Sequence, residues 1–248
     1  ENVDLTATQA AATYEVGADL AVFTLTSATA TSIEGIAQLG YDGNVFTTDA
    51  DGTVVGSDFG DFITTGTSTS AAGTSSVTAG GGKDYVTIAT ASEIDTVVIA
   101  DGDSTTTAWD EISGWDIAAG TAAADNDVLD LDATNIAATI GSTDVGSITG
   151  ATLSNGVITA WAGLGAATVD ADNLADAIAF LQANTSGSDT VAFTYTSDEN
   201  ADDDTADTGE TSTFVFQQGT VDTLIEIIDI TGVTAISTVA AADTIGIA

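Results

Sequence analysis

The sequence predicts a mainly β protein, made of stacked short strands and followed by a C-terminal β-rich part with one α-helix. Hydrophobic residues occupy 44% of the 248 positions, and much of the remainder is Thr, which favours strands together with Val and Ile. Short apolar runs separated by Gly- and Asp-rich turns recur along the chain. The best helical spacing of apolar residues falls in Asp170–Asn184.

The first 48 residues contain several short predicted strands. The patterns favour strands at Tyr14–Val16, Leu20–Leu25 and Asn44–Thr47, and Gly40–Asn44 is a strong turn signal. Ser32–Leu39 fits either a strand or one helical turn, because its pattern does not decide between them.

Two Gly/Asp turns follow, and each leads into a short apolar run. They are Gly56–Thr64, which contains Asp61, and Gly80–Ile88, which contains Asp84. Glycines allow the tight turns that aim backbone carbonyls inward, and the closing aspartate adds an anionic oxygen, the ligand type that Ca²⁺ prefers. We therefore expect calcium sites at these turns, with the following candidate ligands: Asp58, Asp61, Gly80, Gly82 and Asp84.

A clear strand at Asp95–Ala100 leads into a third turn with two further candidate ligands, Asp101 and Asp103. Asp42, Asp49 and Asp51 are additional acidic candidates, although Asp49–Gly52 also fits an ordinary turn. Gly66–Thr78 is rich in Ser, Thr, Gly and Ala, and it fits either a loop or a closely packed coil.

The two turns resemble the Gly-Gly-x-Gly-x-Asp-x-(apolar) nonapeptide of RTX calcium-binding β-rolls. Gly56, Gly80 and Gly82 take glycine positions, whereas Ser57 and Phe59 depart from the pattern, as does Ala79. A further copy, which ends at Asp95, lacks the glycines. Asp84 follows Asp61 by 23 residues and Asp95 follows Asp84 by 11, whereas one turn of an ideal roll takes two nonapeptides, about eighteen residues, so the expected roll is irregular.

The resemblance extends to Trp109–Leu131 and Thr213–Ile236, which are similar to segments of type-I-secreted bacterial surface proteins, including S-layer proteins with RTX modules. It implies a secreted, extracellular or cell-surface protein that stays unfolded inside the cell and folds with calcium outside. Ca²⁺ is the one cofactor that it implies.

The C-terminal part is expected to contain two paired strands, Val191–Tyr195 and Thr213–Gln217. Residues 198–210 between them are strongly acidic, which favours a solvated loop or one ordered by cations. Asp170 and Asp172 suit the start of the helix, and Asn184 or Gly187 its end. Residues 1–135 and 136–248 form two predicted regions, or one continuous domain.

Charge excludes several classes of partner. The chain has 38 acidic residues and one basic residue, Lys83, for a net charge of −37. Nothing neutralises nucleic-acid phosphates, and an anionic membrane surface would repel the chain unless divalent ions bridged the two. No apolar run is long enough to cross a membrane. Adaptation to high salt is an alternative explanation of the acidity.

The residue types also argue against an enzyme. Cys and His are absent, so a zinc site of the His-Glu-x-x-His type and Ser-His-Asp or Cys-His arrangements cannot form. A carboxylate pair remains available, but with 38 acidic residues its spacing carries no information.

We therefore expect a structural subunit of an extracellular calcium-dependent assembly, an S-layer or a surface filament, with further copies of itself as partners. The alternative is an adhesin or glycan-binding module of a larger secreted protein, which contacts cell-surface glycan through calcium or by stacking sugars on Trp109, Trp115 and Trp161.

Overall fold

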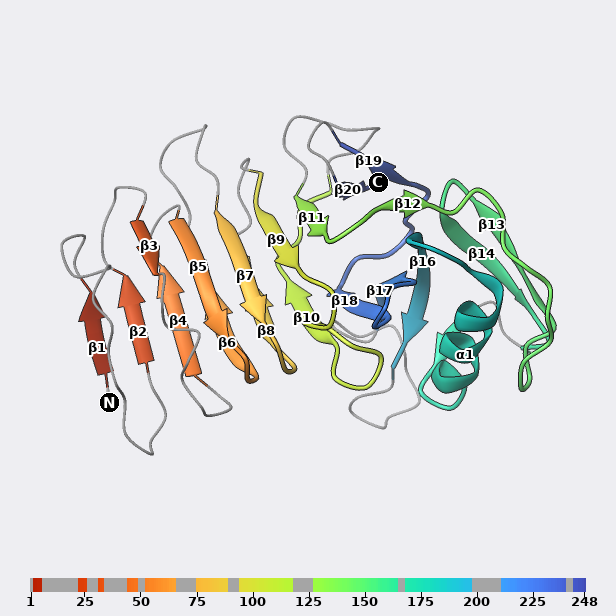
Figure 1. Ribbon diagram of the computed structural model, residues 1–248, viewed down its shortest axis with the longest axis horizontal. Coiled ribbons are helices and arrows are strands. Elements are labelled where there is room, and N and C mark those ends of the chain that lie inside the picture. Colours follow the sequence, from red (N-terminus) through yellow and green to blue (C-terminus); the bar gives the residue numbers. More distant parts are fainter. Residues whose placement is uncertain are drawn as a thin grey trace.

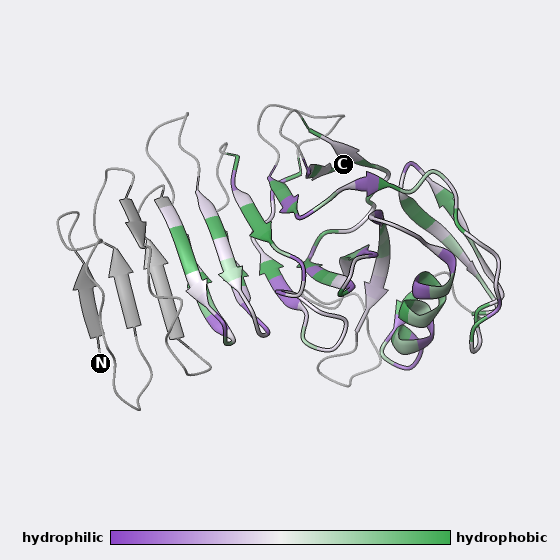
Figure 2. Cartoon of the chain, in the orientation of Figure 1, coloured by the Kyte–Doolittle hydropathy of each residue, from purple (hydrophilic) through white to green (hydrophobic). Residues whose placement is uncertain are grey.

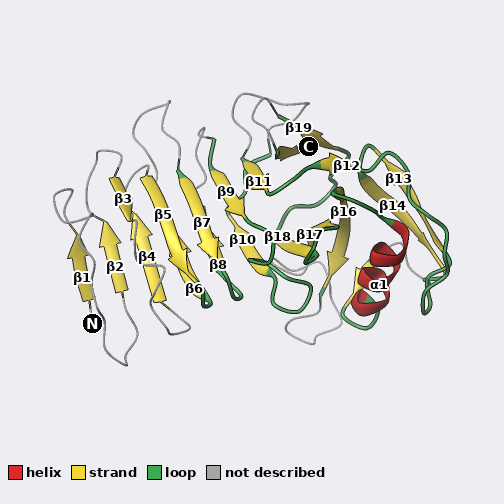
Figure 3. Ribbon diagram, viewed as in Figure 1, coloured by secondary structure: helices red, strands yellow, loops and turns green. Residues whose placement is uncertain are grey.

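The computed structural model describes residues 53–65, 75–88, 94–117, 127–164, 168–197, 211–239 and 243–248, together with the backbone of the strands before residue 53. These parts of the chain are mainly strand with one helix, which confirms the predicted fold class (Figure 3). The strands form two sheets, and no helix in the described parts is long and apolar enough to cross a membrane.

The larger sheet has thirteen strands. Its main path runs through β1 (Asn2–Leu5), β2 (Val22–Leu25), β4 (Asn44–Thr48), β6 (Asp61–Thr64), β8 (Tyr85–Thr87), β10 (Asp110–Ser113), β18 (Thr223–Ile228), β17 (Thr211–Gln217), β16 (Asp189–Thr196), β14 (Val157–Ala162) and β13 (Gly150–Ser154). Two short strands, β12 (Asn135–Ile136) and β15 (Val169–Asp170), also pair with β16.

The smaller sheet has seven strands. Its order is β19 (Ile236–Thr238), β20 (Thr244–Ile247), β11 (Val128–Leu131), β9 (Thr96–Ile99), β7 (Ser76–Gly80), β5 (Gly52–Ser57) and β3 (Thr31–Ile33).

From β3 to β11 the chain alternates between the two sheets, and neighbouring strands within each sheet are parallel. This arrangement is a two-sheet β-roll, in which each coil contributes one strand to each sheet (Figure 1). Alternation along the strands points every second residue inward. The two facing inner rows are Val54, Val77, Val97 and Leu129 in one sheet and Ile63, Val86 and Ile112 in the other, all buried.

The larger sheet continues past the roll into the C-terminal part. β10 pairs in parallel with β18, and β18, β17 and β16 are joined by antiparallel pairings. The helix α1 (Leu174–Asn184) lies at this end of the molecule, opposite the N-terminal coils (Figure 1). A second hydrophobic cluster surrounds its Phe180, and includes Phe193 and Phe214 from the sheet. Figure 2 shows the hydrophobic positions along the strands of the roll and on the helix.

The helix begins later than predicted. Asp170 belongs to β15, and its Oδ1 accepts the backbone N–H groups of Asp172 and Asn173 at 3.0 and 3.2 Å. These bonds hold the chain in a turn, so the first helical residue is Leu174. The predicted end at Asn184 is correct.

The predicted pairing of Val191–Tyr195 with Thr213–Gln217 is confirmed, because Val191 lies opposite Phe216 in an antiparallel ladder. The β13–β14 hairpin was not anticipated from the sequence. Residues 198–210, Tyr14–Val16, and Asp42, Asp49 and Asp51 lie outside the described residues.

Candidate functional site

The two predicted turns lie directly on each other. The segments 56–61 and 79–84 connect the two sheets in adjacent coils, and the N–H of Gly81 donates to the carbonyl of Ser57 at 3.0 Å. A Cβ on Gly56 would lie 2.0 Å from the carbonyl oxygen of Ala79. A Cβ on Gly80, whose φ is +94°, would lie 2.0 Å from the carbonyl oxygen of Ser57. The glycines therefore permit coil-to-coil contact that any side chain would prevent.

Three buried aspartates lie next to these turns, and hydrogen bonds connect them from one coil to the next. Asp61, Asp84 and Asp110 each stand at or just before a strand of the larger sheet, and each is 0% exposed. The N–H of Asp61 donates to Oδ1 of Asp84 at 2.7 Å, and the N–H of Asp84 donates to Oδ1 of Asp110 at 3.0 Å. The N–H of Asp110 donates to the Ser104 hydroxyl at 2.8 Å. We call Asp61, Asp84 and Asp110 the first aspartate ladder.

A second aspartate ladder, made of Asp95 and Asp127, follows the smaller sheet. The N–H of Ser75 donates to Oδ1 of Asp95 at 2.8 Å, and the N–H of Asp95 donates to Oδ1 of Asp127 at 2.9 Å. The remaining oxygen of Asp127 accepts the N–H of Asp116 at 2.6 Å. In both ladders, a carboxylate oxygen in one coil accepts a hydrogen bond from a buried backbone N–H at the start of a strand in the neighbouring coil. A buried N–H without such an acceptor would destabilise the fold.

The first ladder also contains buried oxygens with no hydrogen-bond partner. These are Oδ2 of Asp84 and Oδ2 of Asp110. Removal from water, together with the nearby Asp110 carboxylate, raises the pKa of Asp84 to about 9. Removal from water raises the pKa of Asp110 to about 7, although the N–H of Asp84 opposes the rise. Both carboxyl groups therefore favour a bound proton or a bound cation over a bare negative charge.

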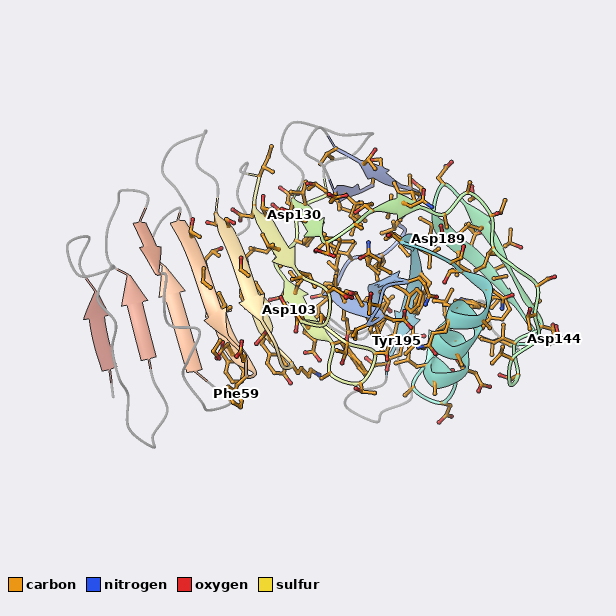
Figure 4. The ribbon with its side chains drawn as sticks, in the orientation of Figure 1. Phe59, Asp103, Asp130, Asp144, Asp189 and Tyr195 are labelled. Carbon is orange, nitrogen blue, oxygen red and sulfur yellow. The ribbon has the colours of Figure 1, made fainter. Side chains whose placement is uncertain are left out.

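Of the other predicted ligands, the structure brings Asp103 to this place. Its carboxylate is close enough to contribute to the raised pKa values of Asp84 and Asp110. Removal from water raises the pKa of Asp103 itself, and the carboxylate of Asp58 adds to the rise. Oδ2 of Asp103 also accepts the N–H of Ala100 at 3.2 Å. Figure 4 shows Asp103 beside β10.

Asp58 and Asp101 are both exposed. Asp58 lies on the stacked turn beside Gly81, whereas Asp101 accepts the N–H of Val221 at 3.1 Å and so lies against the β17–β18 turn. Asp61 is engaged by Ser57, whose N–H and hydroxyl donate to Oδ2 of Asp61 at 2.7 and 2.9 Å. In the parts of the chain that the structure describes, no three acidic side chains are grouped closely enough to hold a metal ion as they stand.

Lys83 lies on the stacked turn beside two aromatic rings. Its Nζ forms an ion pair with Glu111 and lies 5.2 Å from the ring centres of Tyr85 and of Trp109. The indole N–H of Trp109 donates to Oε2 of Glu226 at 3.0 Å. The sole basic residue of the chain thus joins the second turn to β10 and to the aromatic side chains around it.

The three tryptophans do not form an exposed cluster. Trp115 and Trp161 are 4% and 6% exposed and belong to different hydrophobic clusters. Trp109 is partly buried against the second cluster. A sugar-stacking platform built from all three indoles is therefore not present, which counts against that version of the glycan-binding alternative.

Asp110 and Asp127 are not among the site residues predicted from the sequence, although a signal for them exists. Asp61, Asp84, Asp95, Asp110 and Asp127 are all followed by alternating or continuous apolar residues that form a strand. That recurrence of Asp before a strand marks both ladders, whereas the glycine pattern marks only the stacked turns.

The chain matches no protein-family model, and it shows no significant similarity to a curated protein or to a solved structure.

Proposed function

We propose that this chain is a structural subunit of an extracellular calcium-dependent assembly, an S-layer or a surface filament. The observation that carries the proposal is the pair of buried, unpartnered oxygens on Asp84 and Asp110, next to the stacked glycine turns. A divalent cation there would give both oxygens a partner and offset their mutual repulsion.

Calcium fits these turns better than other common metal ions. The neighbourhood offers carboxylate and carbonyl oxygens, and the chain has no Cys or His to bind zinc or copper. Asp84 and Asp110 would supply their unpartnered oxygens, and the other proposed contributors around the turns are Asp58, Asp61, Gly80, Gly82 and Asp103, with Asp101 as a more distant one. The resemblance to the RTX nonapeptide supports the same ion.

The proposal also accounts for the charge of −37. Copies of such a chain repel one another, and calcium within and between them would offset the repulsion. Calcium is abundant outside cells, so we propose that the protein works at the cell surface. A structural role without catalysis is part of this proposal.

Electron microscopy of the purified chain in calcium and then in chelator tests the proposal. We expect ordered sheets or filaments in calcium that disperse on chelation, and no assembly when NaCl replaces calcium. Asp84→Asn should weaken calcium-dependent assembly, whereas Asp172→Asn, which removes one exposed charge before α1, should not. Dispersed particles in every condition, or equal assembly in NaCl, would rule the proposal out.

A second candidate function, glycan binding, is favoured by one cavity. A polar cavity of about 470 Å³ lies between the α1–β16 and β17–β18 connections and is lined by Gln182, Gln218, Asp101 and Asp132, among others. Asp222 orients two of these side chains, because Gln182 and Gln218 donate to it at 2.8 and 2.7 Å. Carboxylate and amide groups of this kind bind sugar hydroxyls. A glycan screen with the Gln182→Ala variant as control tests this candidate.

A further inference from the structure

Three exposed aromatic side chains gather on one edge of the roll. Phe59, Phe62 and Tyr85 are 40%, 47% and 38% exposed, and we call them the aromatic patch. Among the residues that the structure describes, just one other large hydrophobic side chain is exposed, Val221 at 44%. Figure 4 shows Phe59 at the turn where β5 passes into β6. Exposed aromatic side chains that lie together on a folded protein are a candidate contact surface.

The geometry of the patch indicates the kind of partner. The rings of Phe62 and Tyr85 are parallel within 10°, with centres 5.0 Å apart, so each covers a face of the other. Lys83 Nζ lies 5.2 Å from the centre of the Tyr85 ring. Because each ring covers one face of the other, the pair leaves less open ring face for a sugar to stack on than two separate rings would. Its exposed apolar surface lies on the outer face of a sheet and suits the surface of another protein.

The charges around the patch favour a second copy of the same chain. Lys83, the single basic residue, lies beside Tyr85, and the exposed Asp58 lies next to Phe59. The patch therefore has an apolar centre with one cation and one exposed carboxylate at its margin. Lys83 is paired with Glu111 within its own chain, and in a two-fold contact it would also face Asp58 of the other copy, which is the self-complementary arrangement that we infer. Because Lys83 is the one basic residue in the sequence, a contact elsewhere on the chain would include no Lys or Arg side chain.

We propose that the aromatic patch is the surface through which two copies of this chain contact each other. The proposal rests on the proposed assembly function and names the contact by which assembly begins. Apolar burial at the patch supplies attraction, and Lys83 is the one basic side chain that can offset repulsion between the copies there.

Sedimentation velocity over a range of protein concentrations tests the patch, with calcium and with chelator, at high NaCl to screen long-range repulsion. The test variant is Phe62→Thr with Tyr85→Thr, because threonine favours strands and already occupies the neighbouring outward positions 64 and 87. The matched control is Val221→Thr, which removes the exposed hydrophobic residue outside the patch. Thermal melting of all three proteins checks that each is folded.

We expect the wild type and the Val221→Thr control to associate, and the double variant to associate at least about tenfold more weakly. A second variant, Lys83→Gln, should weaken association as well, and more so at low salt. Equal association of the double variant and the wild type would overturn the patch but leave the assembly function standing. Wild-type association that persists in chelator would uphold the patch and contradict calcium dependence. A monomeric wild type in all conditions would overturn both.

Discussion

Oδ1 of Asp84 lies 2.7 Å from the backbone nitrogen of Asp61, one coil away, although both residues are completely buried. The bond makes the carboxyl group of one coil the hydrogen-bond acceptor for the next coil. Oδ2 of the same carboxyl group has no partner. The Asp84 side chain therefore has one oxygen that stabilises the neighbouring coil and one buried oxygen that lacks a proton or cation as its partner. Substitutions of Asp84 can separate the two effects.

The first prediction concerns Asp84→Asn. Asparagine keeps a carbonyl oxygen for the N–H of Asp61 and removes the buried charge. At pH 8 in chelator we expect the variant to melt at least about 3 °C above the wild type, which corresponds to roughly 1 kcal/mol for a chain of this size. In calcium the order should reverse, because the wild type gains stability from the ion and the variant does not. Differential scanning calorimetry measures both, and the same order in both conditions would contradict a calcium site here.

The second prediction concerns pH in the absence of calcium. The pKa values of Asp84 and Asp110 are raised to about 9 and about 7, against about 4 for an aspartate in the unfolded chain. Between these values the folded state holds protons that the unfolded state releases, so the free energy of unfolding falls as pH rises. Stability in chelator should be greatest near pH 4 to 5 and decline through pH 9. Urea unfolding at several pH values measures this decline in the free energy of unfolding. We expect Asp84→Asn to make the decline smaller between about pH 7 and pH 9, where Asp84 titrates.

The third prediction compares two glycines that both have positive φ. Gly80 has φ +94° and no room for a Cβ, because the carbonyl oxygen of Ser57 would lie 2.0 Å from it. Gly187 has φ +63° and nothing within 4 Å of the same position. Gly187→Ala should cost about 1 kcal/mol, from backbone strain alone. Gly80→Ala should cost at least about 3 kcal/mol, since the coils must also separate. Equal losses in urea unfolding would mean that the turns do not stack in solution.

The fourth prediction concerns the connection between the roll and the C-terminal part. The buried hydroxyl of Ser104 donates to the carbonyl of Leu224 at 2.6 Å and accepts the N–H of Asp110 at 2.8 Å. Ser104→Ala leaves both groups buried without that partner, so we expect a loss of about 2 kcal/mol. Ser113→Ala, which removes a hydroxyl on the outer side of β10, should change stability by less than about 0.5 kcal/mol. Urea unfolding of both variants tests the difference.

The sequence predicted the strands and the glycine turns, because these depend on local chemistry. Alternation of Val and Ile around Val97 and Val86 identifies buried strands wherever they lie, and Gly80 marks a position where a side chain does not fit. The helix was also predicted from spacing alone, with only its start misplaced, because Asp170 bonds within the preceding turn.

The aspartate ladders depend on which coil lies beside which, and sequence patterns do not specify that. Asp61 and Asp84 are 23 residues apart and Asp84 and Asp110 are 26 apart, so no fixed repeat connects them. The glycine turns predict that Asp61 and Asp84 are calcium ligands, but no local pattern indicates that both carboxyl groups are buried. Only the register of the parallel strands places these groups in the interior. The pairing of β10 with β18 across more than a hundred residues was likewise beyond local patterns.

The first ladder has a direction. The N–H of Asp61 depends on the carboxyl group of Asp84, that of Asp84 depends on Asp110, and that of Asp110 depends on Ser104, which is bonded to β18. The buried N–H of each coil therefore has a positioned acceptor only after the coil on its C-terminal side has folded. We therefore expect the roll to fold from its C-terminal end toward the N terminus, opposite to the order in which the chain is synthesised.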